Sequence, residues 1–201
     1  MSKTRLEAFS DGVMAILITI MVLELHSPQG TDLDALLALL PELGIYALSF
    51  TFLGIYWNNH HHMLHATERI NGAVLLANLH LLFWLSLIPF GTRWMGETGV
   101  ASLPTAAYGL VLLFSAVAYT ILLRVILACQ PPRSRLAQAV GDDLKGNLSL
   151  AFYVVAIPLA FVNPRIGLAI FALVALIWVV PDPRIESRLN RAQSSDQITD
   201  H

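Results

Sequence analysis

Three side chains capable of chemistry lie in the first apolar segment of the chain. Arg5, Ser10 and Asp11 occupy the first half of residues 5–25, and Thr19 is the hydroxyl in the apolar run that follows. A charged side chain near the centre of a bilayer costs about 2.5–3.5 kcal/mol on insertion scales, so such groups usually face protein or water. The segment therefore predicts a polar site within a membrane-spanning helix.

A second group of reactive side chains is the histidine run at the end of the second apolar segment. The run His60-His61-His62 and the nearby His65 could place two imidazoles on one helix face, and imidazole is a common metal ligand. Membrane metal enzymes need several such clusters, whereas this sequence has one, and His80 stands alone in the next segment. We therefore expect hydrogen bonding from His60 or His61, with no metal site, no cofactor and no enzymatic activity.

The composition is that of an integral membrane protein. Of the 201 residues, 56% are apolar and 13% are charged, and the mean hydropathy is +0.64. These values are too apolar for a soluble domain of this size. No basic patch indicates binding to nucleic acid, and the single cysteine, Cys129, cannot form an internal disulfide.

Six apolar runs are long enough to cross about 30 Å of hydrocarbon at about 1.5 Å per residue. Pro41 is expected to kink or restart the second run, because proline lacks the backbone N–H that a helix needs. Residues 1–181 are predicted to form one all-α, six-helix transmembrane domain, and residues 182–201, which are polar, a cytoplasmic tail. The predicted spans are residues 5–25, 36–60, 70–92, 104–129, 146–162 and 165–181.

The basic residues support an even number of spans with both termini in the cytoplasm. Of the 12 Lys and Arg residues, only Arg93 and Arg165 fall on the outer side in that arrangement. Lys and Arg concentrate in the cytoplasmic loops of membrane proteins. The sequence therefore predicts a multi-pass protein of the cell membrane.

The first segment separates into two faces when it is drawn as a helix. Residues at spacings of three and four form one stripe, whereas Ser10 and Asp11 point well away from it. The stripe either packs against neighbouring helices, as most stripes do, or faces a symmetry axis. Around an axis, several copies would stack hydrophobic rings able to gate by dewetting. The members of the stripe are Gly12, Ile16, Thr19, Ile20 and Leu23.

Three ordered motifs in the first half of the chain resemble one membrane protein family. Arg5-x-x-x-Phe9-Ser10-Asp11, followed by Gly-Val-x-Ala-Ile and then Thr19, is similar to the signature of the transmembrane protein 175 family. This family comprises the endosomal and lysosomal potassium channels and their bacterial relatives. Trp57-Asn58-Asn59-His60-His61 resembles the exit of the family's second helix, and Asn78 followed by Ile88-Pro89-Phe90-Gly91-Thr92 resembles its third.

The resemblance implies a potassium channel that lacks the usual carbonyl filter, and the sequence contains no T-V-G-Y-G segment. Animal members contain two six-helix repeats and pair as dimers, so one repeat implies a homotetramer whose first helix lines a central pore. Ile16, Ile20 and Leu23 would form hydrophobic rings around that pore and Thr19 a hydroxyl ring. The structural polar network implied behind the pore comprises Arg5, Phe9, Ser10, Asp11, Trp57, Asn58, His60 and His61.

The sequence therefore predicts a potassium-permeable channel of modest selectivity, whose partners are further copies of itself, potassium ions and membrane lipid. Two alternatives are a small proton-coupled transporter, with Asp11 and the histidines as a relay, and a non-conducting membrane scaffold or intramembrane enzyme. Because imidazole titrates near pH 6.5, pH-dependent gating is a further hypothesis. Asn78 and His80 are expected to form hydrogen bonds between helices. Glu24 is expected at the end of the first helix, where an exposed charge needs no functional role.

Overall fold

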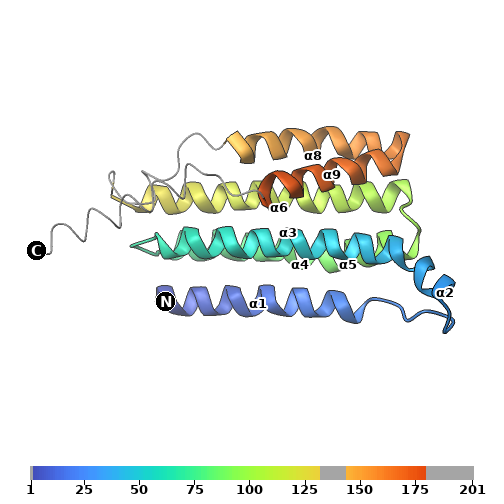
Figure 1. The fold of residues 1–201 in the computed structure, drawn as a ribbon. Coiled ribbons are helices and arrows are strands. Elements are labelled where there is room, and N and C mark those ends of the chain that lie inside the picture. The colour runs from blue at the N-terminus through green and yellow to red at the C-terminus, as the bar shows by residue number, and fades with distance from the viewer. Residues whose placement is uncertain (1, 132–143, 180–201) are drawn as a thin grey trace, which may run out of the picture.

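The computed structural model describes residues 2–131 and 144–179, and their regular structure is entirely helical. The long helices lie side by side with nearly parallel axes, and the short α2 lies obliquely at one end of the bundle (Figure 1). α1 forms one edge of the bundle, α3 to α5 lie next to it, and α6, α8 and α9 form the opposite side. The helices are α1 (Lys3–Leu23), α2 (Leu33–Ala38), α3 (Leu40–His65), α4 (Gly72–Ser86), α5 (Ile88–Glu97), α6 (Ser102–Cys129), α8 (Leu144–Val162) and α9 (Pro164–Val179).

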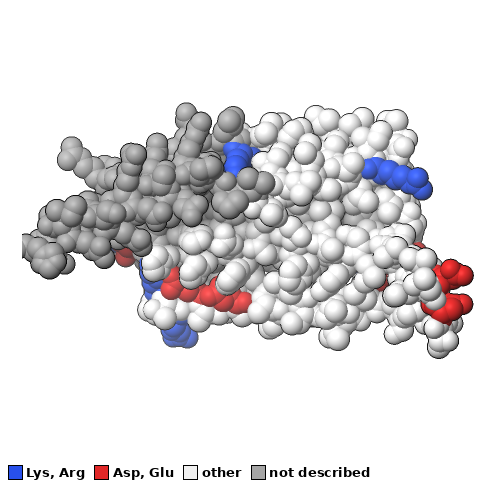
Figure 2. Space-filling view, viewed as in Figure 1, with Lys and Arg blue, Asp and Glu red and all other residues white. Residues whose placement is uncertain are grey.

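Several helices are long and apolar enough to cross a membrane. By length and composition these are α1, the combined rod Gly72–Glu97, α6 and the segment Lys145–Val162 of α8. On the face that Figure 2 shows, charged side chains lie toward the two ends of the bundle, with an uncharged band between them. These features indicate a multi-pass membrane protein. The 26-residue α3 and the shorter, apolar α9 would complete the six spans that the sequence predicts.

Two prolines determine where helices begin. Pro41 lies in the first turn of α3, directly after α2, which confirms the expected restart of the second span. The third predicted span is two helices, α4 and α5, separated at Leu87. Pro89 lies in the first turn of α5, and its missing N–H removes one helical hydrogen bond there. The rod then continues to Glu97, past the predicted end at residue 92. The predicted tail, residues 182–201, lies outside the described residues.

A buried group of hydroxyls joins α3, α5 and α6. The Tyr108 hydroxyl lies 2.8 Å from Ser49 Oγ, and Thr92 Oγ1 lies 2.7 Å from the same atom. Tyr108 and Ser49 are completely buried, so these hydrogen bonds satisfy polar atoms that have no access to solvent. The group therefore fixes the position of α5, which in turn contacts α1.

Gly109 allows α6 to approach α8 and α9 closely. A Cβ added at Gly109 would stand 2.7 Å from Phe171 Cζ and 3.0 Å from Ile157 Cγ1. Both distances are too short for unstrained carbon atoms. The absent side chain is therefore a packing requirement on this side of the bundle.

Gly109→Ala is expected to lower the free energy of unfolding by about 1–3 kcal/mol, the typical cost of overpacking a core. Gly44→Ala is the matched control, because nothing lies within 4 Å of its added Cβ and alanine favours the helix. Thermal unfolding in detergent measures both variants. If Gly109→Ala and Gly44→Ala unfolded at the same temperature, the expected clash would be contradicted.

Candidate functional site

α1 has one face in the bundle and one face outside it. The residues that α1 buries follow helical spacing along a single face, and Met14 and Met21 are almost completely buried. Ile16, Ile20 and Leu23 are 57%, 38% and 81% exposed. The four predicted pore residues therefore lie together on the side of α1 that the rest of the described chain leaves uncovered. The buried residues of α1 are Leu6, Ser10, Met14, Leu17 and Met21.

The hydroxyl of Thr19 has a defined orientation. Thr19 Oγ1 donates its hydrogen to the Ile16 carbonyl at 2.9 Å, and the residue is exposed. Since the hydrogen is used within the helix, the remaining lone pairs of the oxygen are available to a group beyond the helix surface. A cation is such a group. Thr19 thus places an electronegative atom between the apolar side chains of Ile16 and Ile20.

A buried chain of hydrogen bonds joins α1, α4 and α3. Asn78 Nδ2 donates to Ser10 Oγ at 3.0 Å, and Asn78 Oδ1 lies 2.7 Å from His60 Nε2. Ser10 and Asn78 are fully buried, and His60 is 1% exposed. Because Oδ1 can only accept, His60 donates its Nε2 hydrogen. His60 Nδ1 has no hydrogen-bond partner among the described residues.

A second contact between α1 and α3 lies beside this chain. Trp57 Nε1 donates to Asp11 Oδ1 at 3.1 Å. The Trp57 ring also stacks against His61, with ring centroids 6.2 Å apart and an angle of 28° between the planes. At the same end, Lys3 Nζ donates to the His65 carbonyl at 2.7 Å. The beginning of α1 is therefore bound to α3 by several polar contacts.

Comparison with known proteins gives the family. A family model described as "Endosomal/lysosomal potassium channel TMEM175" matches residues 5–89. A potassium channel of Chryseobacterium sp. (strain P1-3) is 51% identical over 189 residues, which cover 94% of this chain and 98% of the relative. The chain belongs to the TMEM175 family.

Two further comparisons agree with the TMEM175 assignment. A potassium channel of Streptomyces collinus is 31% identical over 197 residues, which cover 91% of this chain and 96% of the relative. The crystal structure of a lysosomal potassium-selective channel TMEM175 homolog from Chamaesiphon minutus matches with a TM-score of 0.76 and 26% identity. That match covers 88% of this chain and 96% of the other. The names of these TMEM175 relatives indicate a channel rather than an enzyme, and they do not favour the transporter alternative.

The structure does not bring every member of the predicted network together. Arg5 and Phe9 are exposed on α1, on the same side as Ile16. Asn58 is also exposed, and among the described residues no hydrogen bond of its side chain or of the Arg5 guanidinium is present. Asn78 is the central residue of the network, although the sequence predicts only that it bonds between helices. The sequence feature that could have identified Asn78 is its position as a single amide side chain within a leucine-rich helix.

The histidines do not form a metal site in the part of the chain that the structure describes. No group of three or more His, Cys, Asp or Glu side chains there could hold a metal ion. His61 and His65 stack with centroids 6.1 Å apart, and His61 meets His62 edge to face at 5.6 Å. His80 Nε2 accepts a hydrogen bond from Trp84 Nε1 at 3.0 Å, within α4. The expected bond from His80 to another helix is therefore absent among the described residues.

Proposed function

We propose that the chain is one subunit of a potassium-permeable cation channel, in which four copies surround a pore lined by α1. The observation that carries this proposal is the exposure of one α1 face in the isolated subunit. Ile16, Thr19 and Leu23 are uncovered there, while the opposite face is packed against α3, α4 and α5. The bacterial relatives are named potassium channels, and on that basis potassium is the proposed permeating ion.

The same face accounts for how such a pore would work. Rings of Ile16, Ile20 and Leu23 would form a hydrophobic constriction that ions cross only when it is wet. Thr19 would contribute a ring of oxygen atoms, with the lone pairs free because each hydrogen is bound to Ile16. No carbonyl filter is needed in this mechanism. Selectivity would depend on the oxygen ring, the pore width and the cost of partial dehydration, so a modest preference for potassium is expected.

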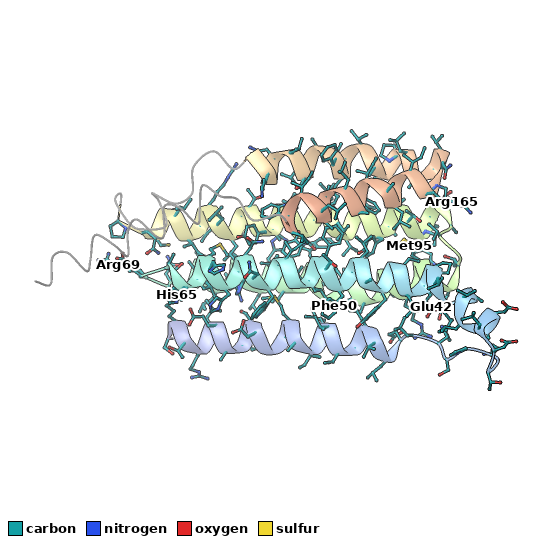
Figure 3. All side chains as sticks on the ribbon, in the orientation of Figure 1. Glu42, Phe50, His65, Arg69, Met95 and Arg165 are labelled. Atoms are coloured by element: carbon teal, nitrogen blue, oxygen red, sulfur yellow. The ribbon has the colours of Figure 1, made fainter. Side chains whose placement is uncertain are left out.

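Charge supports an orientation in the cell membrane with six spans and both termini in the cytoplasm. His65 and Arg69 lie at the end of the bundle where α1 begins, and Glu42 and Arg165 lie at the opposite end (Figure 3). The beginning of α1 supplies two more basic residues, Lys3 and Arg5, to the first end. Lys and Arg favour the cytoplasmic side, so the end where α1 begins would face the cytoplasm.

The polar contacts behind α1 would hold the pore wall in place. Ser10 and Asp11 are bonded to α4 and α3 rather than directed to the exposed stripe. The permeating ion would therefore touch Thr19 and the apolar rings but not these groups. Arg5 and Phe9, which are exposed in the subunit, would complete their contacts with a neighbouring copy.

Reconstitution of the purified chain tests this proposal. Unitary currents in a planar bilayer, together with collapse of a potassium gradient in liposomes, are expected, and native mass spectrometry should detect four copies. Saturable transport without unitary currents would contradict a channel. Liposomes that hold their potassium gradient would favour a non-conducting scaffold.

Thr19→Val is expected to reduce the preference for potassium over sodium, because valine has nearly the same shape but no oxygen. The reversal potential under bi-ionic conditions measures this preference. Thr51→Val is the matched control, since the Thr51 hydroxyl donates to the Ala47 carbonyl within α3 and lies away from the stripe. An unchanged reversal potential in Thr19→Val would show that the oxygen ring has no part in selectivity.

A further inference from the structure

The end of α1 is tied to α5 by a single arginine. Glu24 caps α1, and its Oε2 accepts a hydrogen bond from Arg93 Nη1 at 2.8 Å. The same guanidinium donates through Nε to Glu97 Oε1, also at 2.8 Å. Sixty-nine residues separate Glu24 from Arg93 along the chain. We call Glu24, Arg93 and Glu97 the Arg93 bridge.

A second contact secures the chain just beyond α1. The backbone N–H of His26 donates to Glu42 Oε1 at 3.1 Å, and His26 Nδ1 lies 3.2 Å from the same oxygen. Glu42 is in the first turn of α3. The loop that follows α1 is thus attached to α3, while Glu24, the cap residue directly after the helix, is attached to α5.

The geometry of the Arg93 bridge favours a positioning role. A guanidinium has donors in a fixed planar fork, so it can hold two carboxylates at defined directions. Glu97, one turn after Arg93 in α5, binds the Nε side of the guanidinium and so restrains the arginine that also binds Glu24. α1 has no basic residue in its last turn, and a cation favours the negative end of a helix dipole. All of these groups are partly exposed, so their contribution to stability is small. Their effect is on where α1 ends.

We propose that Arg93 is a positioning residue that fixes the end of α1, and through it the ring of Leu23 in the pore. Leu23 directly precedes Glu24 and is 81% exposed, so few contacts within the subunit hold its side chain. The bridge therefore limits how far the last turn of α1 can tilt toward or away from the axis. This inference rests on the proposed pore, because it assigns the control of one ring in that pore.

The test compares loss of either partner of the bridge. Glu24→Gln removes a negative charge and Arg93→Gln a positive one, so a pure effect of surface charge would change potassium conductance in opposite directions. A shared positional role instead predicts the same direction for both, by about two- to fivefold, the range expected for one exposed ion pair. The double variant should equal either single variant. Arg93→Lys, which keeps the charge but loses the fork, should fall between Arg93→Gln and the wild type.

Arg165→Gln is the matched control. Arg165 is exposed at the same end of the bundle, and its side chain has no hydrogen bond or ion pair among the described residues. It should change conductance less than Arg93→Gln does. Opposite changes in Glu24→Gln and Arg93→Gln, or an Arg93→Gln conductance equal to that of Arg165→Gln, would overturn the inference.

A second measurement does not depend on conduction. A nitroxide on Leu23→Cys, in a Cys129→Ala background of the full chain, reports the local mobility of the last turn of α1 by electron paramagnetic resonance. Arg93→Gln should increase this mobility and Arg165→Gln should not. Increased mobility in a chain that conducts no ions would support the bridge and contradict the proposed function. Normal currents with unchanged mobility would support the proposed function and contradict the role of the Arg93 bridge.

Discussion

Replacing Asn78 with leucine is expected to lower the free energy of unfolding by about 1–3 kcal/mol and to disturb assembly of the proposed tetramer. Asn78 is fully buried and bonds to Ser10 on one side and to His60 on the other. Leucine has a similar size but can bond to neither, which leaves two buried polar side chains without their partner. A buried polar group that loses its partner costs about 1–3 kcal/mol. Hydrogen bonds between membrane helices are often weaker, so the combined loss lies in the same range.

Asn58→Leu is the matched control, because Asn58 is exposed and its side chain has no hydrogen bond among the described residues. Thermal unfolding in detergent and native mass spectrometry measure stability and assembly. A second comparison isolates the contact with Ser10. Ser10→Ala should cost less in the Asn78→Leu background than in the wild type, because its partner is already gone. Equal costs in the two backgrounds would show that the two side chains do not act together.

The division of α1 into two faces could be predicted from the sequence, because it depends on helical periodicity alone. Spacings of three and four place Ile16, Ile20 and Leu23 together and direct Ser10 elsewhere, whatever the neighbouring helices do. The structure shows the first group exposed and Ser10 buried. The local effect of proline on a helix also predicted the restart at Pro41.

The partners of these side chains could not be predicted in the same way. Asn78 reaches Ser10 across 68 residues, and that contact depends on how α4 is rotated against α1. The sequence placed Ser10 and Asp11 in one network with the end of the second span. Asp11 does bond to Trp57 there, whereas Ser10 bonds to Asn78 of α4. Glu24 likewise looked like an unpaired charge at a helix end, whereas Arg93 binds it. Side-chain pairs between distant segments follow from packing, which no local pattern contains.

The length of the third span was also only partly predictable from the sequence. Pro89 lacks a backbone N–H, which locates the break before α5. Other contacts determine how long the helix after the break is. Thr92 and Met95 are buried against neighbouring helices, and the i, i+4 pair of Arg93 and Glu97 stabilises the final turn. These contacts extend the helix to Glu97. A prediction from apolar residues alone therefore underestimates the length of the rod, because its last residues are held by polar and tertiary contacts.

Ile16→Ala and Leu23→Ala are each expected to raise the unitary potassium conductance. Alanine widens a hydrophobic ring and lets water remain there, which lowers the cost of bringing a partly dehydrated ion through it. A barrier lower by about 1 kcal/mol corresponds to a roughly fivefold higher rate. Single-channel recording at fixed potassium concentration measures the change. If Ile16, Ile20 and Leu23 variants all conduct like the wild type, the pore lies elsewhere.

Met14→Ala is the control that separates a pore wall from a packed helix face. Met14 lies on α1 between Ser10 and Leu17 but is completely buried within the subunit. Its truncation should cost about 2–5 kcal/mol of stability through the cavity that it leaves, with little effect on conductance. Ile16→Ala should show the opposite pattern, since 57% of that side chain is exposed and little packing is lost. Two residues only half a turn apart would then differ in which property they control, because Met14 faces the core of the described chain and Ile16 would face the proposed ion path.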